Sequence, residues 1–315
     1  MVRAVNAVKD QIPEDIDLDR DNDGAVDMVT FVLAGSIAGG EDQIRWPHQT
    51  WLYDEGAKIN GKIVGSYNIQ VENTLRRTPS DDTSYTFQTG SEIISHETLH
   101  VIGLPDLYYY KFDVLNGKVT ERDTRAMGDW DIMSKSQGAH MCAYIKNQYC
   151  KWLDIPEIKD PGTYTVSPLV DGGNCAYMIR SPRNSIEYYV IEYRRKVGAF
   201  ESNVPSSSLV VYRVLADHVG RGNGDAESSA GRDDEIRQVG ARSNGSLSLN
   251  FSNGKSSGLT ISNISTTSEK ATFTVSFPSD KNLYYFKDQK MADAICTALG
   301  KSEEQVTKAD LAGLE

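Results

Sequence analysis

The sequence predicts an α+β domain followed by an all-β domain of sandwich type. Three observations support this division. The first 155 residues mix strand-like runs with two helical segments, one of which carries a histidine motif. Residues 163–278 instead form short runs of alternating apolar and polar side chains, separated by Gly, Ser and Asn turns. The chain has 315 residues, which is more than one ordinary domain contains.

The first domain is expected to combine strands with two helices. Residues 28–34 (MVTFVLA) are apolar and rich in β-branched side chains, and we expect them to form a buried strand. Strand-like residues recur at 62–71. From Gly90 to about Ile102 the pattern becomes helical, and Gly103 ends this helix as a C′ glycine does. A second helix is expected over residues 139–153.

Prolines at 156 and 161 indicate a domain boundary, so we expect domains over residues 1–155 and 156–280. Residues 220–245 are polar and Gly-rich, which favours a long exposed loop. Residues 281–315 are helical in character and form a third region. The expected strands of the sandwich include TYTVSPL, EYYVIEY, SLVVYRVL, SLSLNF and ATFTVSF, with alternating burial along EYYVIEY.

Composition and charge exclude several classes of protein. The chain is 39% hydrophobic and 24% charged, values that argue against a disordered or fibrous protein. Its net charge of -11, from 44 acidic and 33 basic residues, argues against nucleic acid or an anionic membrane as the main partner. No apolar run approaches the roughly 18 residues that cross a bilayer, so we expect no membrane span.

The four cysteines are too few for a disulfide scaffold. Cys142 and Cys150 would lie about 12 Å apart along one helix, beyond the reach of a disulfide. Pairing of either with Cys175 or Cys296 and four unpaired thiols both remain open. The cysteines therefore do not settle the redox compartment.

The most specific feature is the motif HExxHxxGxxD, which begins at His96. His96 and His100 are spaced i, i+4 on the predicted helix, so both imidazoles can bind one zinc ion. Glu97 lies beside that position and can take a proton from a zinc-bound water. Gly103 lets the chain leave the helix sharply, and Asp106 can return as a third, anionic ligand. Three protein ligands plus water are typical of a catalytic zinc site.

An acidic turn precedes the first strand and predicts a second cation site. Its alternating aspartates, followed by Gly24, resemble the start of an EF-hand-type calcium loop, although Thr30 stands where the bidentate acid of such a loop is found. Clustered carboxylates repel one another unless a cation compensates, and this favours Ca²⁺ over the alternative of a solvated acidic turn. The aspartates of this turn are Asp17, Asp19, Asp21, Asp23 and Asp27.

Together with Trp130-Asp131-Ile132-Met133-Ser134 downstream, the zinc motif resembles the metzincin metallopeptidases. The sequence His-Glu-x-x-His-x-x-Gly-Leu-Pro-Asp-Leu-Tyr is similar to that of the immune inhibitor A family of secreted bacterial peptidases. The acidic Asp-Gly turn, Trp46-Pro47-His48 and the helix ending in Lys151-Trp152-Leu153 are also similar to that family. The resemblance covers about residues 15–280 and implies a metzincin-like first domain.

The resemblance implies a secreted or cell-surface bacterial zinc endopeptidase that acts on proteins or peptides. It makes Glu97 the general base and Met133 the methionine of a turn beneath the metal. The zinc ligands that it implies are His96, His100 and Asp106, although some metzincins use His as the third ligand. Many metzincins also carry a tyrosine shortly after the turn methionine. The first one here is Tyr144, so that role is unassigned.

The ends of the chain suggest a longer natural protein. Residues 301–314 are similar to the N-terminal cap of bacterial extracellular leucine-rich repeats, which implies a repeat array after this chain. We therefore expect a propeptide and a C-terminal repeat region outside the sequence. Substrate is expected to lie extended along a strand edge within residues 63–71. Residues 108–110 are three tyrosines that either line the cleft or pack beneath the loop.

Two alternatives come from other classes of protein. The first is an adhesion or binding module on a degenerate peptidase scaffold that keeps a structural zinc. Glu97 separates it from the enzyme, because a structural site needs no acid between its histidines. The second is a cytosolic metal-binding protein, which the calcium-like turn disfavours because cytosolic calcium is scarce.

Overall fold

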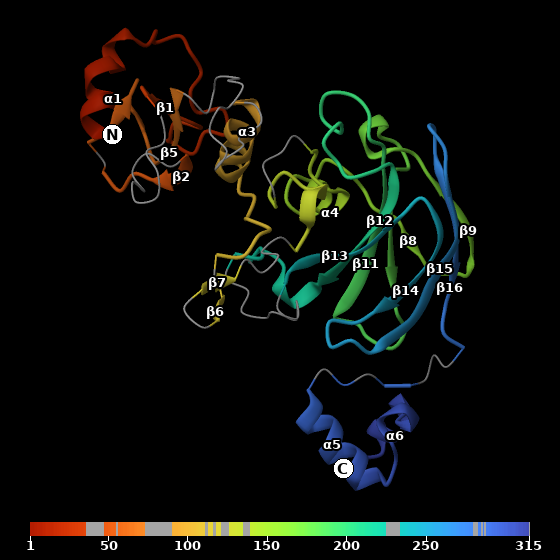
Figure 1. The fold of residues 1–315 in the computed structure, drawn as a ribbon. Helices are drawn as coiled ribbons and strands as arrows, with labels where there is room; N and C mark the ends of the chain where they lie inside the picture. The colour runs from red at the N-terminus through yellow and green to blue at the C-terminus, as the bar shows by residue number, and fades with distance from the viewer. Residues whose placement is uncertain are drawn as a thin grey trace. The chain divides into compact units, whose positions relative to one another are not determined.

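The computed structural model describes residues 1–35, 47–54, 56–72, 90–110, 113–115, 118–120, 126–134, 139–224, 234–279, 283–284, 286 and 288–314. It is a mixed α/β protein made mostly of β-sheet with few helices (Figure 1). The chain divides into one compact unit made mainly of Met1–Leu104 and a second made mainly of Pro105–Lys135 and Ala139–Glu315. The division therefore falls directly after the zinc-motif helix and not at the expected boundary near residues 154–162.

The first unit contains a helix, a small sheet and the helix of the zinc motif. Its three-stranded sheet has the order β1-β5-β2, with β5 parallel to β1 and antiparallel to β2. Helix α3 packs against β5 and β2. The elements are α1 (Val2–Val8), β1 (Thr30–Leu33), β2 (His48–Trp51), the paired strands β3 (Lys58–Ile59) and β4 (Lys62–Ile63), β5 (Ser66–Val71) and α3 (Gly90–Val101).

The sequence predicted β1, β5 and α3, but it misjudged the burial of β1 and the pairing of β5. The helix expected from Gly90 is confirmed, and Gly103 follows it with φ of +93°. A strand forms within residues 28–34, but it is not fully buried, since Val32 is 55% exposed. Strand β5 is paired on both sides, so the expectation that substrate adds along residues 63–71 is wrong for this strand. Trp46 of the quoted Trp-Pro-His segment lies outside the described residues.

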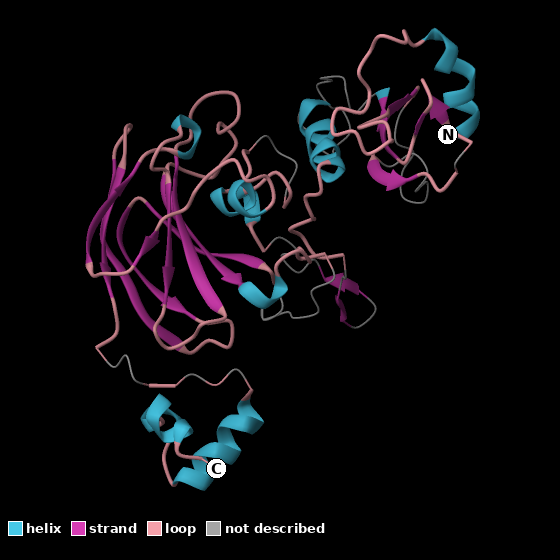
Figure 2. Ribbon diagram, turned by 180° about the vertical axis from the view of Figure 1, so that it is seen from behind, coloured by secondary structure: helices cyan, strands magenta, loops and turns pink. Residues whose placement is uncertain are grey.

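The second unit is built on two sheets that enclose an apolar core, as the sequence predicts (Figure 2). One sheet has five strands in the order β13-β12-β11-β10-β8, and the other has four in the order β14-β15-β16-β9. The strands are β8 (Glu157–Ile158), β9 (Gly162–Val166), β10 (Ala176–Arg180), β11 (Glu187–Arg194), β12 (Ser208–Leu215), β13 (Ile236–Arg242), β14 (Asn244–Asn250), β15 (Ser256–Thr266) and β16 (Ala271–Ser276).

Before the sandwich, the second unit contains the paired strands β6 (Asp113–Leu115) and β7 (Lys118–Thr120), a short 3-10 helix η3 (Gly128–Trp130) and helix α4 (Ala143–Gln148). Helix α4 is much shorter than the helix expected over residues 139–153. The expected loop over residues 220–245 is wrong as well, because it contains β13 and buried residues at 222–224.

The five-stranded sheet is buried on both faces. Alternation of burial along EYYVIEY was expected, yet every residue of β11 and β12 is buried. Tyr189, Ile191 and Tyr193 point into the core between the two sheets. The intervening residues point to the opposite face, where residues within 126–134 and 139–149 bond to the sheet. This coverage explains why Pro105–Lys135 and the chain from Ala139 onward form one compact unit with the sandwich.

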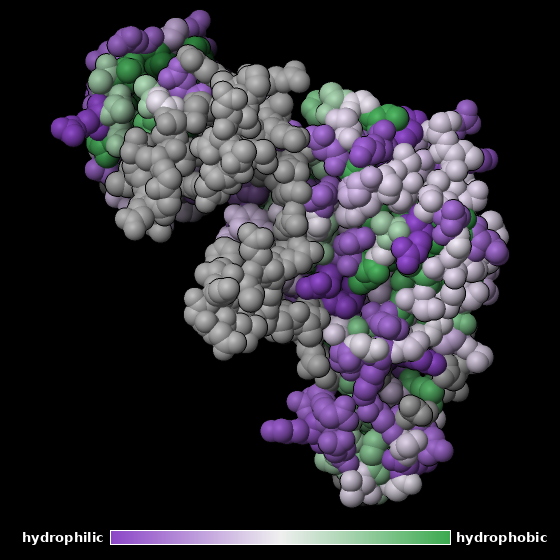
Figure 3. All heavy atoms as spheres, in the orientation of Figure 1, coloured by the Kyte–Doolittle hydropathy of each residue, from purple (hydrophilic) through white to green (hydrophobic). Residues whose placement is uncertain are grey.

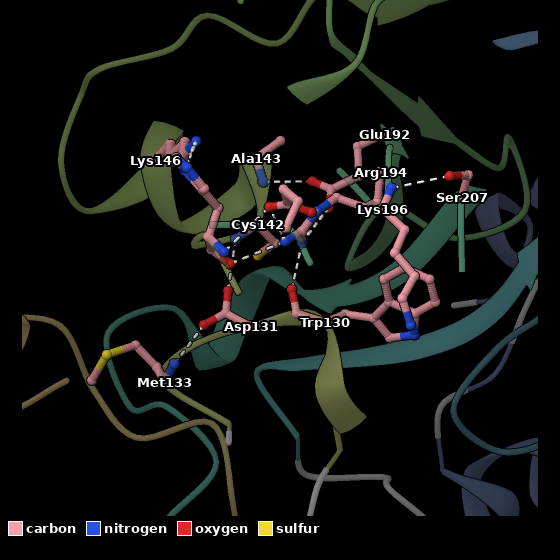
Figure 4. Close-up of polar contacts among 12 residues, drawn as sticks. Trp130, Asp131, Met133, Cys142, Ala143, Lys146, Glu192, Arg194, Lys196 and Ser207 are labelled. Carbon is pink, nitrogen blue, oxygen red and sulfur yellow. Dashed lines mark hydrogen bonds and ion pairs between the residues drawn. The ribbon is translucent and has the colours of Figure 1, made fainter. Parts of the chain in front are cut away.

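Arg194 anchors this cover through a buried ion network (Figure 4). The Arg194 side chain is 0% exposed, and its Nε and Nη2 donate to the Glu201 carboxylate at 2.8 and 2.6 Å. Its Nη1 donates to Glu192 Oε1 at 3.1 Å and to the carbonyl of Trp130. Nη2 also donates to the carbonyl of His140 at 3.2 Å. One guanidinium is therefore the counter-charge that two buried carboxylates share, and it holds two segments of the cover.

Two buried carboxylates, Asp131 and the same Glu192, also hold the cover by accepting backbone N–H groups. Asp131 accepts from Met133 N and Cys142 N, both at 2.7 Å, and Glu192 Oε2 accepts from Ala143 N at 2.6 Å. Burial raises the pKa of both Asp131 and Glu192, against the lowering effect of these hydrogen bonds and of Arg194. The turn at Met133 and the start of α4 are thus fixed to the same sheet face.

The C-terminal region is helical, as expected, and forms a small core of its own. Helix α5 (Gln289–Leu299) is capped by Asp288, whose side chain accepts from Met291 N at 2.8 Å, and it ends at Gly300 with φ of +64°. Helix α6 (Lys308–Ala312) follows. The core of this region contains Phe286, Ala292 and Val306.

Two chain-wide features concern the surface and the cysteines. Hydrophilic and neutral side chains cover most of the sandwich on the face drawn in Figure 3. Among the described residues, no helix is long and apolar enough to cross a membrane. All four cysteines are free, including the buried Cys142 and Cys175.

Replacing Arg194 should be strongly destabilising, because Arg194→Met leaves Glu192 and Glu201 buried without a counter-charge. We expect a loss of about 3–5 kcal/mol in the free energy of unfolding, measured by urea denaturation. The neighbouring Arg195→Met is the control, since the Arg195–Asp171 pair is only partly buried and its loss should cost less than about 1 kcal/mol. Equal effects of the two substitutions would contradict the importance of the network.

His140 should make the fold sensitive to mild acid. Burial, together with nearby Lys146 and Arg194, lowers the pKa of His140 to about 4 despite Glu201. The unfolded chain therefore binds a proton first as the pH falls through about 6.5, and stability is lost between about pH 6.5 and 4.

His140→Gln should reduce the stability difference between pH 7.5 and 5.5, by up to about 1 kcal/mol because solvent screens part of the effect. Chemical denaturation at the two pH values measures this difference. A variant whose decline matches that of the wild type would show that other groups cause it.

Candidate metal centre

Helix α3 brings the two histidines of the motif together. The Nε2 atoms of His96 and His100 lie 3.1 Å apart, and the rings meet edge to face with centroids 4.7 Å apart. Two nitrogens that bind one tetrahedral zinc ion at about 2.0–2.1 Å are separated by about 3.3 Å. The observed spacing therefore fits a shared ion, as the i, i+4 pattern predicts.

The end of α3 orients the ring of His100. Its Nδ1 lies 2.7 Å from the carbonyl oxygen of Leu104, and a carbonyl can only accept, so Nδ1 carries the proton. The lone pair is then on Nε2, the atom that faces His96. Gly103 makes this contact possible, because its positive φ turns the chain back beneath the helix.

Asp106 completes the predicted donor set. One ligand atom from each of His96, His100 and Asp106 lies within 4.8 Å of the other two. Asp106 is 8% exposed, and its Oδ2 accepts from the hydroxyl of Tyr110 at 2.5 Å. Two imidazoles and one carboxylate fit zinc with a fourth position left for water.

Glu97 is not one of the three residues in this group. It follows His96 on α3, and both side chains are buried, with Glu97 8% and His96 5% exposed. A buried carboxylate next to a ligand histidine, but outside the donor set, is where the motif predicts a general base.

The turn at Met133 lies against the segment that carries Asp106. Met133 is fully buried, and its carbonyl oxygen accepts from the N–H of Leu107 at 2.9 Å. The turn itself is closed by Ser134 N, which donates to Asp131 O at 3.1 Å. The sequence predicted an apolar methionine beneath the metal, and the structure places this residue one hydrogen bond from the neighbour of Asp106.

The sequence left open the role of the three tyrosines after Asp106, and it did not indicate Arg237 or Asn223, which lie beside them. Tyr109 is buried, its hydroxyl accepts from Arg237 Nη2 at 2.6 Å, and burial raises its pKa. Tyr110 is 50% exposed beside Asp106, so the three tyrosines do not share one role. Asn223 and its neighbouring glycines contact the same segment. A lone asparagine in a Gly-rich stretch gives no sequence signal, because Asp106 and Leu107, to which Asn223 bonds, are more than a hundred residues away.

Three of the five aspartates of the acidic turn come together. Asp19, Asp21 and Asp27 have ligand atoms within 4.8 Å of one another. Asp17 and Asp23 are outside this group, and each accepts a nearby backbone N–H, from Asp19 and Ala25 respectively. These three grouped carboxylates keep the pattern predicted for a cation site.

Lys62 supplies a positive charge to the same turn. Its Nζ donates to Asp19 Oδ2 at 2.6 Å, which lowers the pKa of Asp19, with further help from the N–H groups of Gly24 and Asp23. No local sequence pattern indicates this ion pair, because Lys62 lies on β4, more than forty residues after Asp19. Part of the repulsion that favoured calcium is therefore relieved by the protein itself.

Comparison with known proteins gives no family for the chain. No family model, curated protein or solved structure matches it.

Proposed function

We propose that this chain is a zinc-dependent endopeptidase that hydrolyses peptide bonds of extracellular proteins. The observation that supports this proposal is the donor set of His96, His100 and Asp106, with buried Glu97 beside it on α3. The resemblance of the motif to immune inhibitor A peptidases supports the same reaction and a secreted or cell-surface bacterial protein. The turn at Met133 supports a metzincin-type catalytic domain.

Different residues of the protein would bind the metal and transfer the proton during hydrolysis. A bound Zn²⁺ ion supplies Lewis acidity, which lowers the pKa of its water toward 7 and polarises the substrate carbonyl. His96, His100 and Asp106 hold the ion, and the Leu104 carbonyl keeps the ring of His100 in place. Glu97 accepts the proton of the attacking water and returns it to the leaving amine.

Asp106 also sets the charge of the site. An anionic third ligand gives the occupied site a lower positive charge than a third histidine would, and carboxylate oxygen is a harder donor than imidazole. The Tyr110 hydroxyl, which donates to the same carboxylate, withdraws part of that charge. Together these groups moderate how strongly the site polarises a bound carbonyl.

Glu97→Ala should abolish hydrolysis while leaving zinc bound, because Glu97 acts on the proton and not on the metal. We expect activity on unfolded casein to fall at least about 10²-fold with one zinc retained, measured by peptide release and metal analysis. Ser95→Ala, on the exposed side of α3, is the control and should behave as the wild type. Loss of zinc from Glu97→Ala would make Glu97 a ligand.

The same experiment decides between the enzyme and the alternative binding module. Zinc in the wild type and in Glu97→Ala, with hydrolysis in neither, would favour a structural zinc. Activity in the wild type alone would favour the enzyme.

We also propose that Asp19, Asp21 and Asp27 bind Ca²⁺ in the acidic turn, with Lys62 as a competing cation. Calcium removal should then lower the melting temperature of the wild type, because the three carboxylates lose their bridging ion. Asp21→Ala should abolish this response, whereas Asp10→Ala, an exposed acid outside the turn, should keep it. Scanning calorimetry with and without a calcium chelator measures the response. An unchanged response in Asp21→Ala would exclude this site.

The C-terminal helices α5 and α6 are proposed as the start of a leucine-rich-repeat region. This proposal rests on the resemblance of residues 301–314 to a repeat cap.

A further inference from the structure

The tripeptide Gly222-Asn223-Gly224, called the clamp below, contacts the segment that carries the third metal ligand. It follows β12 and precedes β13, and all three residues are buried. The ligand segment, residues 105–110, belongs to the same compact unit. More than a hundred residues of chain separate the clamp from Asp106, so only the tertiary structure brings them together.

Asn223 bonds to two successive backbone carbonyls, that of Asp106 itself and that of the next residue. Its N–H donates to the carbonyl of Asp106 at 2.8 Å, and its Nδ2 donates to the carbonyl of Leu107 at 3.2 Å. The carbonyl of Gly224 accepts from Tyr110 N at 2.9 Å. The clamp therefore holds the backbone that directly follows the Asp106 side chain.

The two glycines of the clamp allow this close approach. A Cβ atom on Gly222 would lie 2.6 Å from the carbonyl oxygen of Asp106, and one on Gly224 would lie 2.5 Å from the ring of Tyr110. Both distances are too short for a Cβ atom. Gly222 can therefore approach the Asp106 backbone, and Gly224 the present position of the Tyr110 ring, only because they lack one. Tyr110 is the residue whose hydroxyl donates to the Asp106 carboxylate, and the clamp therefore supports the ligand and its partner.

The clamp is itself tied to the five-stranded sheet. Asn223 is 0% exposed, its Nδ2 also donates to the carbonyl of Ile236 at 2.7 Å, and its Oδ1 accepts from Ile236 N at 3.3 Å. Ile236 begins β13 and pairs with Val214 of β12. Glu235, also 0% exposed, accepts from Gly222 N at 2.6 Å and from the hydroxyls of Tyr144 and Tyr149.

We propose that Asn223 is a positioning residue for the metal centre, and that the clamp presents Asp106 as a ligand from the frame of the β-sandwich. The metal in this inference rests on the proposed function, whereas the contacts between Asn223 and the ligand segment are observed. A short loop that carries a ligand must hold its carboxylate within a few tenths of an ångström for tight binding. Two hydrogen bonds from Asn223 hold this segment at the Asp106 and Leu107 carbonyls, and two more between the Asn223 side chain and Ile236 tie Asn223 to the sheet.

The first test replaces Asn223 with alanine in the full chain. Zn²⁺ affinity is measured by competition with a fluorescent chelator, and amide hydrogen exchange is measured for Leu107 and Tyr110 in the zinc-free chain. We expect the zinc dissociation constant to rise about 10–100-fold and both amides to exchange faster. Asn184→Ala is the control, because Asn184 Oδ1 accepts from Ile186 N in the same sandwich without touching the ligand segment.

A double-mutant cycle with Asp106→Ala separates positioning from general destabilisation. If Asn223 acts through Asp106, Asn223→Ala should cause no further loss of zinc affinity once Asp106 is removed. An equal loss in both backgrounds would show that Asn223 acts on the fold as a whole and would overturn the proposal.

Paired glycine substitutions keep the question open to test if Asn223→Ala does not fold. Gly222→Ala and Gly172→Ala both place alanine at positive φ, +65° and +72°, but only Gly222 has Asp106 within reach. We expect Gly222→Ala alone to weaken zinc binding and to speed exchange at Leu107. Equal zinc affinities in the two variants would overturn the proposal.

Failure of the proposed function looks different from failure of this inference. A wild-type chain that binds no zinc would end the proposed function and the metal part of this inference together. The exchange rates of Leu107 and Tyr110 would then still decide whether Asn223 holds the segment. Zinc binding that depends on Asp106 but not on Asn223 would leave the proposed function standing and remove the clamp.

Discussion

The burial of Arg194 is the constraint on which the second unit depends. A guanidinium removed from water must be matched by charge and hydrogen-bond acceptors, and Glu192, Glu201 and two backbone carbonyls provide them. Those carbonyls belong to Trp130 and His140, which flank the turn at Met133. The sheet therefore cannot satisfy its own buried charge unless this segment covers it, because without the segment Arg194 loses two of its hydrogen-bond acceptors.

This dependence gives the β-sandwich a direct part in the candidate metal centre. The turn at Met133 is held by Asp131, and its carbonyl in turn accepts from Leu107. Asn223 donates to the carbonyls of Asp106 and Leu107, and its side chain is also bonded to Ile236 at the start of β13. The segment of residues 105–110 thus bonds to Met133, Asn223 and Gly224 of the sandwich unit, although the motif that predicts Asp106 begins on α3. A domain that looks accessory in sequence supplies the frame for a ligand.

Local sequence and distant partners contribute differently to the two candidate cation sites. In α3, the spacing of His96 and His100 and the turn at Gly103 produce the donor pair with no help from far along the chain. In the acidic turn, the grouping of Asp19, Asp21 and Asp27 also follows from local spacing. What the local pattern omits is Lys62, which reaches Asp19 from β4 and changes the charge balance of that site.

The sequence by itself determined the elements whose signal is local. Helical periodicity ending at a glycine located α3, the motif named the residues of the donor set, and alternating strands between turn residues indicated two sheets. Tertiary structure alone decided which faces are covered. Strand β11 is buried on both faces because residues 126–134 and 139–149 lie on it, and the compact unit begins at Pro105 for the same reason. Tertiary structure also turned an expected loop into β13 and gave Asn223 its role. Hydrogen bonds between residues a hundred positions apart leave no periodicity in the sequence, because each partner's identity is set by geometry that exists only after folding.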